Sequence, residues 1–418
     1  MSDPASLLAA SSTAGIFANR NLRLYLGSVL LNNLAIQIQS VAVAWQVYAL
    51  SGSPLALGYV GLAQFVPILA LCLPAGNLAD RCDRRLILAL SFALQGLAAG
   101  GFLVFSLATP RHLWPFYLLL ALFGSARALG GPAAQSLLPQ LVERRQFPEA
   151  VAWNSSSNRI GVIVGPALGG AIYLLGAAVA YGSCLALFAV IAGTIVRVRT
   201  TVRFEAAVEA SMLQRLTAGI RYVWAQPIVL GAISLDLFAV LLGGATALLP
   251  VYARDILHVG PSGLGLLRSA PAVGAAIVGL SLGRRPLNGR AGAIMFAGVA
   301  CFGLATVVFG ISSNFGLSLG ALVVLGACDM LSVYVRATLI QLATPDPMRG
   351  RVSAVNRVFV GASNELGGFE SGVTAALFGT VPAVVLGGVG TLAVVAVWWR
   401  LFPTLRQVDR LTDVMAFE

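Results

Sequence analysis

The stretch "GNLADRCDRR" (76–85) concentrates charge between two long apolar stretches. Residues 55–75, "LALGYVGLAQFVPILALCLPA", come before it, and residues 86–108, "LILALSFALQGLAAGGFLVFSLA", follow it. Each apolar stretch is long enough to cross a bilayer as a helix, which takes about 20 residues. The pattern therefore predicts two transmembrane helices joined by a short, strongly charged turn.

The composition of the whole chain also indicates a membrane protein. The sequence is 58% hydrophobic and 10% charged, whereas soluble domains carry about 25% charged residues. A net charge of +11 would suggest nucleic acid as the partner of a soluble protein. In a membrane protein, however, basic residues gather on the cytoplasmic side. We therefore expect a lipid bilayer as the environment and no nucleic-acid partner.

Twelve apolar segments of about 20 residues predict an all-α integral membrane protein. They are 24–48, 55–79, 86–108, 114–139, 150–175, 178–197, 228–252, 262–282, 291–311, 315–342, 353–379 and 381–402. All 27 basic residues are arginines, and placing both termini in the cytoplasm puts 20 of them inside. Two, Arg111 and Arg254, then lie outside, and five lie within helices. This bias predicts that both termini are cytoplasmic.

The longest hydrophilic stretch divides the twelve segments into two sets of six. Within it, "EASMLQRLTAGIRYVW" (209–224) has Ile220 and Trp224 on an apolar face and Arg221 on another. This pattern predicts a helix along the cytoplasmic membrane surface. The predicted parts are an N-terminal six-helix bundle at 1–197, a linker at 198–226, a C-terminal six-helix bundle at 227–402 and a cytoplasmic tail at 403–418.

The two halves are similar to each other when residues about 200 positions apart are compared. "LFGSAR" (122–127) corresponds to "VLGACD" (324–329), and Asn154 corresponds to Asn356. Parallel repeats of six helices are typical of transporters, whose substrate site lies between the halves near the middle of the membrane. The sequence thus predicts two pseudo-symmetric halves and a transport function.

The charged turn resembles the signature loop of the major facilitator superfamily, Gly-x-Leu-Ala-Asp-Arg-x-Gly-Arg-Arg. The matching residues are Gly76, Leu78, Ala79, Asp80, Arg81, Arg84 and Arg85, and Asp83 replaces the second glycine. The resemblance implies the major facilitator fold, alternating access, a functional monomer and a loop that gates the cytoplasmic side. Asp80 can accept hydrogen bonds there from a helix N-terminus or an arginine. The alternative is that these charges only enforce topology.

A second motif, "GVIVGPALGG" (161–170), lies in the predicted fifth helix. It is similar to the helix-five motif of superfamily antiporters at Gly161, Gly165, Pro166, Gly169 and Gly170. Glycines four residues apart allow close backbone contact with another helix, so ordinary helix packing is the alternative. With the resemblance, the motif favours export by antiport.

Among subfamilies, the chain most resembles the enterobactin-exporter group, the transmembrane secretion effectors. The resemblance is carried by "LADRCDRR" (78–85), "PDPMRGRVSAVNRV" (345–358) and "GASNELGGFESG" (361–372). It implies substrates such as siderophores, macrolides and other amphipathic molecules.

In the superfamily, helices one, four, seven and ten line the substrate cavity. Ionisable groups at membrane depth are costly and commonly functional, and polar or charged groups occur in all four corresponding segments. The candidate cavity residues are Asn32, Asn33, Gln37, Arg127, Asp236, Asp329 and Arg336. Arg127 and Asp329 occupy corresponding repeat positions, and we hypothesise that they approach each other in one access state. The alternative is that each pairs within its own half.

Proton coupling would have to use carboxylates, because both histidines, His112 and His258, lie in predicted loops. The candidates are Asp236, Asp329 and, after them, Glu365. Burial and a nearby arginine change the proton affinity of a carboxylate in opposite directions, so a moving arginine could act as a switch. Each carboxylate could instead belong to a permanent ion pair.

Other functional classes fit less well. The five cysteines occur singly and the two histidines are far apart, so we expect no metal site and no cofactor. The chain shows no nucleophile–base set for an enzyme and no phosphate-binding loop for an ATP-driven pump. We predict a secondary active transporter of the bacterial inner membrane that exports a small amphipathic molecule, siderophore-like or drug-like, by proton antiport. An importer or uniporter of the same fold is the alternative, and an integral-membrane enzyme or receptor is a more remote one.

Overall fold

The structure is a computed structural model that describes residues 16–108, 112–199, 212–285, 287 and 289–409. The described chain is helical and forms two compact units, each with its own internal contacts. The first unit comprises Met1–Ala42 and Val66–Glu209, and the second comprises Val43–Phe65 and Ala210–Glu418. The predicted domain boundaries at 197 and 227 stay predictions. Arg111, residues 200–211 of the linker and the tail from 410 lie outside the described residues.

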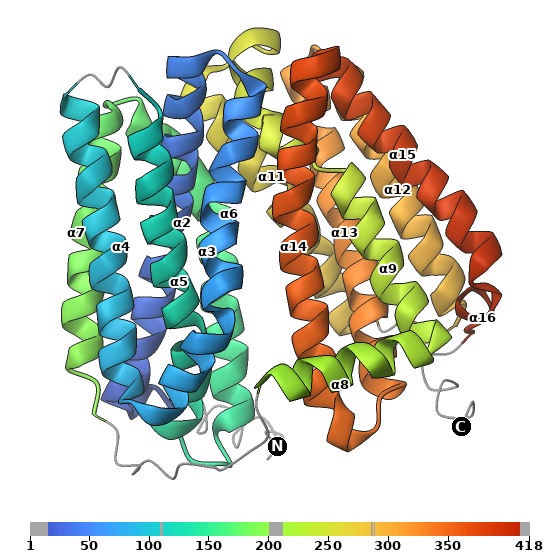
Figure 1. The fold of residues 1–418 in the computed structure, drawn as a ribbon, viewed down its shortest axis with the longest axis horizontal. Helices are drawn as coiled ribbons and strands as arrows, with labels where there is room; N and C mark the ends of the chain where they lie inside the picture. The colour runs from blue at the N-terminus through green and yellow to red at the C-terminus, as the bar shows by residue number, and fades with distance from the viewer. Residues whose placement is uncertain (1–15, 109–111, 200–211, 286, 288, 410–418) are drawn as a thin grey trace, which may run out of the picture. The chain divides into compact units, whose positions relative to one another are not determined.

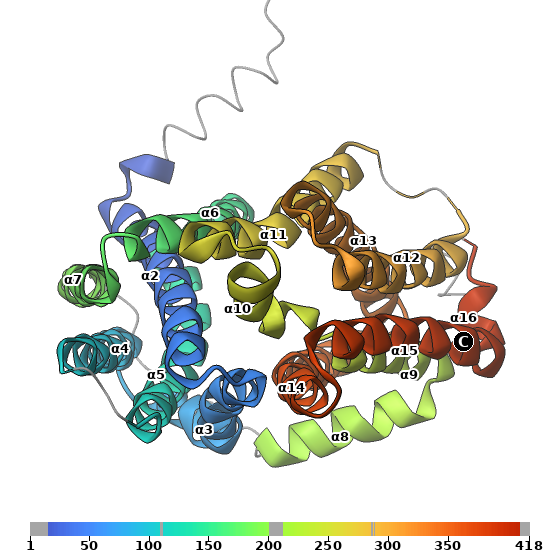
Figure 2. The ribbon, with the colours of Figure 1, turned by 90° about the horizontal axis from the view of Figure 1, so that it is seen from above.

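Six long helices contribute to the first unit, and the adjoining ends of the first two belong to the second unit. The six helices are α2 (Arg20–Ser51), α3 (Pro54–Arg81), α4 (Arg84–Leu107), α5 (Trp114–Leu141), α6 (Phe147–Tyr173) and α7 (Ala177–Val196). Both α5 and α7 pack against α4 (Figures 1 and 2). At this contact the fully buried ring of Phe102 lies 5.3 Å from Tyr181 and 5.7 Å from Phe116 between ring centres. Stacked and tilted aromatic pairs of this kind add to the stabilisation from apolar burial.

The second unit contains the remaining helices. They are α8 (Met212–Ala225), α9 (Pro227–Leu242), η1 (Ala245–Leu248), α10 (Leu249–Val251), η2 (Tyr252–Ile256), α11 (Gly260–Arg284), α12 (Ala291–Ile311), α13 (Phe315–Leu342), α14 (Asp346–Phe378), α15 (Thr380–Leu401) and α16 (Pro403–Arg406). The predicted seventh span is therefore interrupted: α9 ends at Leu242, and the chain continues through the short elements up to Ile256. A pair of glycines, Gly243 and Gly244, accounts for the break, because glycine disfavours a helix interior.

The tip of the α2–α3 hairpin, residues 43–65, groups with the second unit. Small residues make the contact possible: a Cβ atom at Gly372 would lie 3.0 Å from the Cα of Gly58. A polar cluster adds to it, in which the Tyr48 hydroxyl donates to the Asp255 carboxylate. Arg254 donates from Nη1 to the Tyr48 carbonyl at 3.2 Å, and its guanidinium lies 5.6 Å from the centre of the Tyr48 ring.

Eleven of the predicted segments correspond to single long helices in the described chain, and the seventh is the interrupted one. Ten helical segments there are long and apolar enough to cross a membrane. The predicted fifth and eleventh segments form α6 and α14, of 27 and 33 residues, which are not among the ten. Polar runs such as "WNSSSNR" (153–159) and "SNELGGFE" (363–370) lower their hydropathy. Twelve spans and the cytoplasmic location of the termini therefore stay predictions.

The glycine motif of α6 packs against α2 within the first unit. A Cβ at Gly161 would lie 2.5 Å from the Cβ of Asn33, and one at Gly165 would lie 2.6 Å from the Cβ of Gln37. At Gly169 the obstacle would be backbone, the Cα of Ile38 at 2.9 Å. Only glycine allows this approach, because non-bonded carbon atoms prefer separations of about 3.5–4.0 Å.

Gly161→Ala is expected to lower the free energy of unfolding by about 1–3 kcal/mol, the usual cost of overpacking a close-packed contact. The measurement is denaturant unfolding of the purified protein in detergent, followed by circular dichroism. Gly193→Ala in α7 is the matched control, since no heavy atom lies within 4 Å of its added methyl group. There alanine should be neutral or stabilising by about 0.5–1 kcal/mol, through its higher helix propensity. Equal effects of the two substitutions would contradict the packing role of Gly161.

Candidate functional site

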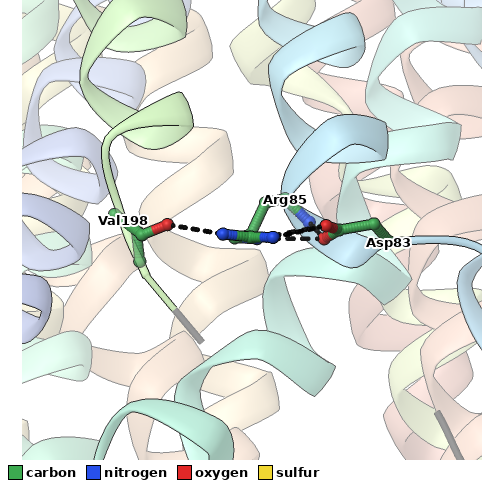
Figure 3. A network of polar contacts seen from close by, with 3 residues as sticks. All are labelled: Asp83, Arg85 and Val198. Atoms are coloured by element: carbon green, nitrogen blue, oxygen red, sulfur yellow. Dashed lines mark hydrogen bonds and ion pairs between the residues drawn. The ribbon is translucent and has the colours of Figure 1, made fainter. Parts of the chain in front are cut away.

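The charged loop between α3 and α4 is organised by Asp83 (Figure 3). Its carboxylate accepts a hydrogen bond from the backbone N–H of Arg85 at 2.9 Å and so caps the start of α4. The same carboxylate pairs with the Arg85 guanidinium at 2.6 Å. Arg85 in turn donates from Nη1 to the Val198 carbonyl at 3.0 Å. The loop is thus tied to the segment that follows α7.

The residue that departs from the superfamily pattern therefore has a structural role here. Asp83 has a φ of −61°, so the position requires no glycine, and aspartate is among the best helix N-cap residues. Arg84 donates from Nε to the Ala79 carbonyl at 3.4 Å, and Arg81 is exposed. The side chain of Asp80 lies outside the described residues. The gating role of the loop, Gly76 included, stays a prediction.

The ion pair gives the loop a defined pH dependence. Hydrogen bonding from Arg85 holds the pKa of the Asp83 carboxyl below its ordinary value of 3.8. Because the pKa is lower in the folded state, the stabilisation is present above pH 3.8 and is lost as the pH falls through the folded-state value. Asp83→Asn keeps a capping side chain but removes the charge. At pH 7 it should lower the free energy of unfolding by about 0.2–1 kcal/mol, as for other partly exposed pairs.

Thermal unfolding in detergent between pH 3 and 7 measures this dependence. The difference between the wild type and Asp83→Asn is expected to shrink below about pH 4. A difference that stays constant, or grows, as the pH falls would contradict the role of the Asp83–Arg85 pair.

A cavity of about 510 Å³ lies within the first unit. Residues from α2, α4, α5 and α6 line it, together with Ile195 of α7. The amide and guanidinium side chains in the lining are Asn32, Asn33, Gln95, Arg127, Gln135, Asn154 and Asn158. Polar groups that converge in a cavity inside membrane-spanning helices are expensive to bury and mark candidate substrate sites.

The amides of α2 and α6 are linked across the contact made by the glycine motif. Asn33 donates from Nδ2 to the Asn158 side-chain oxygen at 2.7 Å and also to the Val29 carbonyl at 2.8 Å. Asn158 donates from its own Nδ2 to the Asn154 carbonyl at 3.0 Å. This chain of hydrogen bonds fixes the orientation of the amides along one wall of the cavity.

Several amide oxygens in the cavity wall have no hydrogen-bond partner among the described residues. They are Oδ1 of Asn32, Oε1 of Gln95 and Oδ1 of Asn154. A buried acceptor without a donor costs about 1–3 kcal/mol. Water or a ligand that supplies hydroxyl or amide donors would remove that cost, so the wall is suited to a ligand rich in such groups.

The structure brings together part of the predicted cavity set. Asn32, Asn33 and Arg127 all line the cavity, and the Arg127 guanidinium also lies 6.0 Å from the centre of the Phe123 ring. Gln37 packs against Gly165 and is not among the lining residues. Asp329 belongs to the second unit and Arg127 to the first, so their approach stays a prediction.

Sequence reasoning missed Gln95, Gln135 and Asn158 as cavity residues. A usable signal was present for α6, because Asn154 and Asn158 are four residues apart and therefore share a helix face. Gln95 could not be found in this way, since it lies in the third predicted helix, outside the four that the resemblance assigns to the cavity. Its side chain is 2% exposed and is oriented by a hydrogen bond of 3.2 Å from Nε2 to the Ser91 hydroxyl.

In the second unit, two of the predicted residues form a buried ion pair. Asp236 of α9 pairs with Arg336 of α13, and their side chains are only 6% and 5% exposed. The third carboxylate candidate, Glu365 of α14, interacts electrostatically with Arg268 of α11. No hydrogen bond or ion pair within the described chain joins Asp329 of α13 to another side chain.

Breaking the buried pair is expected to be costly, because it leaves a charge without its partner in an apolar interior. Asp236→Asn should lower the free energy of unfolding by about 3–5 kcal/mol. Removing both charges with Asp236→Leu and Arg336→Met together should cost much less than the sum of the single changes. Asp346→Asn is the control, because that carboxylate is 82% exposed and should change stability by less than about 0.5 kcal/mol. The free energies of unfolding are measured in detergent. If the double substitution costs as much as the two single substitutions together, the ion pair between Asp236 and Arg336 is contradicted.

Comparison with known proteins places this arrangement in a family. Residues 11–415 match the family described as transmembrane secretion effector. The chain belongs to this family, within the major facilitator superfamily. It is similar to the enterobactin exporter EntS of Citrobacter koseri, with 26% identity over 383 residues that cover 90% of each chain. It is also similar to the enterobactin exporter EntS of Shigella boydii, with 27% identity over 331 residues that cover 77% of each chain.

Among solved structures, the chain is similar to a bacterial homologue of the human lysosomal transporter Spinster in an inward-facing, occupied conformation. The TM-score is 0.70 at 14% identity, over 92% of this chain and 95% of that one. At this identity the likeness shows the fold alone. With the family match, the chain is a major facilitator transporter and not an enzyme, and it is a multi-pass protein of the inner membrane.

Proposed function

We propose that the protein exports a small amphipathic molecule, of siderophore-like chemistry, in exchange for protons by alternating access. The observation that carries the proposal is the amide-lined cavity of about 510 Å³ inside the first unit. The relatives named enterobactin exporters support a siderophore as the substrate. A siderophore offers the hydroxyl and amide donors that Oδ1 of Asn32, Oε1 of Gln95 and Oδ1 of Asn154 lack.

Arg127 has a defined role in this proposal. It lies in the cavity wall, where a guanidinium can donate several hydrogen bonds in a fixed planar arrangement. Hydrogen bonds from an ionised donor are about twice as strong as neutral ones. Arg127 therefore orients acidic or carbonyl oxygens of the substrate, while the asparagine amides of α2 and α6 bind its polar edge.

Asp329 is the proton carrier that the charge distribution favours. Asp236 is held by Arg336, and Glu365 has Arg268 nearby. A nearby arginine favours the charged form of a carboxylate, so in this proposal Asp236 and Glu365 take up protons when their arginines move. Asp329 can change its protonation state without breaking such a pair, which makes it the simplest site for coupling.

The gate in this proposal includes the loop at 76–85. The Asp83–Arg85 pair and the hydrogen bond from Arg85 to the Val198 carbonyl tie the loop to the end of α7. Alternating access requires elements that switch between two arrangements. Hydrogen bonds at a partly exposed loop are suited to this, because water can replace them when they break.

Proton flux in proteoliposomes tests the proposal. The vesicles contain a pH-sensitive dye, a proton gradient is imposed, and catecholate or hydroxamate siderophores or amphipathic drugs are added. A transported compound is expected to dissipate part of the gradient. Asp329→Asn should abolish the proton flux while the compound still binds, and Arg127→Gln should weaken binding by about tenfold, the loss of roughly 1.4 kcal/mol of a charge-assisted hydrogen bond.

Asp346→Asn, on an 82% exposed carboxylate, is the matched control and should behave as the wild type. Uptake of a radiolabelled compound without proton movement would contradict antiport and indicate a uniporter. Unchanged coupling in Asp329→Asn would contradict the assignment of the carrier.

A further inference from the structure

Helix α8 is held firmly by the second unit. It crosses the ends of α9 and α14 (Figures 1 and 2). Gly219 allows the contact, since a Cβ there would lie 2.8 Å from the Arg351 carbonyl oxygen. Tyr222 donates its hydroxyl to the Ala343 carbonyl at 2.8 Å, and Val223, 3% exposed, joins a core cluster with residues of α9, α13 and α14.

The apolar stripe of α8 is not what packs against the protein. Ile220 is 37% exposed and Trp224 is 69% exposed. The two side chains share a helix face at a spacing of four residues, whereas Gly219 and Val223 face the unit. An exposed tryptophan and isoleucine on an amphipathic helix need an apolar environment, and tryptophan in particular is enriched where headgroups meet acyl chains.

The position of Trp224 points to the bilayer as that environment. Pro227, three residues further on, begins α9, at the start of the segment Pro227–Ile256 that is long and apolar enough to cross a membrane. Trp224 therefore lies next to the end of a candidate membrane span. The arginine distribution predicts that this membrane surface is the cytoplasmic one.

A basic side chain flanks the exposed pair Ile220 and Trp224, because Arg221 is exposed on α8 next to them. The sequence of α8, MLQRLTAGIRYVWA, contains two arginines and no acidic residue. The charge that α8 presents beside its apolar stripe is therefore positive, and positive charge attracts the anionic lipids of the cytoplasmic leaflet.

We propose that the exposed face of α8, with Trp224, Ile220 and Arg221, binds an anionic phospholipid. Arg221 takes the phosphate of the headgroup, while Trp224 and Ile220 contact the first carbons of the acyl chains. Because Tyr222 and Gly219 join α8 to the α13–α14 connection, a lipid bound here holds the end of α14 at a fixed depth in the membrane. The inference does not depend on which substrate is carried.

Lipid binding to the full-length protein in detergent tests the proposal. The probes are phosphatidylglycerol and phosphatidylcholine with matched acyl chains, and bound lipid is counted by native mass spectrometry. The wild type is expected to retain phosphatidylglycerol in preference to phosphatidylcholine. Arg221→Gln should weaken phosphatidylglycerol binding by about fivefold, the effect of one basic residue at an anionic surface. Arg144→Gln, on an exposed arginine of the loop before α6, is the matched control and should bind as the wild type.

A second measurement tests whether Trp224 lies at the depth of the lipid headgroups. In bilayers with lipids brominated near the headgroup, fluorescence quenching in the wild type should exceed that in Trp224→Phe. If Arg221→Gln and Arg144→Gln lose phosphatidylglycerol binding equally, the lipid is attracted by the overall positive charge of the protein and the proposed site is overturned. Equal binding of the two lipids, displacement of lipid by millimolar inorganic phosphate, or absence of Trp224 quenching would each overturn it as well.

Discussion

The close approach of α6 to α2 is the contact on which the candidate site depends. Gly161, Gly165 and Gly169 let the two helices touch along one stripe, and packing of this kind replaces the hydrophobic effect as the main attraction between helices in lipid. The same contact sets Asn33 against Asn158. A motif that favours antiport by resemblance is therefore also the physical reason why the amides of two helices meet in one cavity wall.

The low polarity of the membrane interior decides how the remaining charges are arranged. Asp236 and Arg336 neutralise each other where both are almost fully buried. Arg127 lines the cavity of the first unit. A charged partner and a polar cavity are both ways to make an ionisable group tolerable at membrane depth.

Outside the apolar interior the same residue types behave differently. Asp83 caps α4 and pairs with Arg85 while both side chains remain partly exposed, 24% and 30%, so the interaction is weak enough to break and re-form. At α8 the situation is reversed, because the large apolar side chains of Ile220 and Trp224 are the exposed ones.

The amino-acid sequence by itself determined the class of the protein. Hydropathy over about 20 residues marks the spans, and the pattern around Gly76 to Arg85 and the glycines of 161–170 indicates the family. It also identified Asn32, Asn33 and Arg127 as cavity-lining residues, because polar groups in apolar segments are few and costly. Only the tertiary structure decided their partners: Asn158 for Asn33, Arg336 for Asp236 and the Val198 carbonyl for Arg85. These contacts join residues that are distant along the chain, and local periodicity carries no information about which helix faces meet.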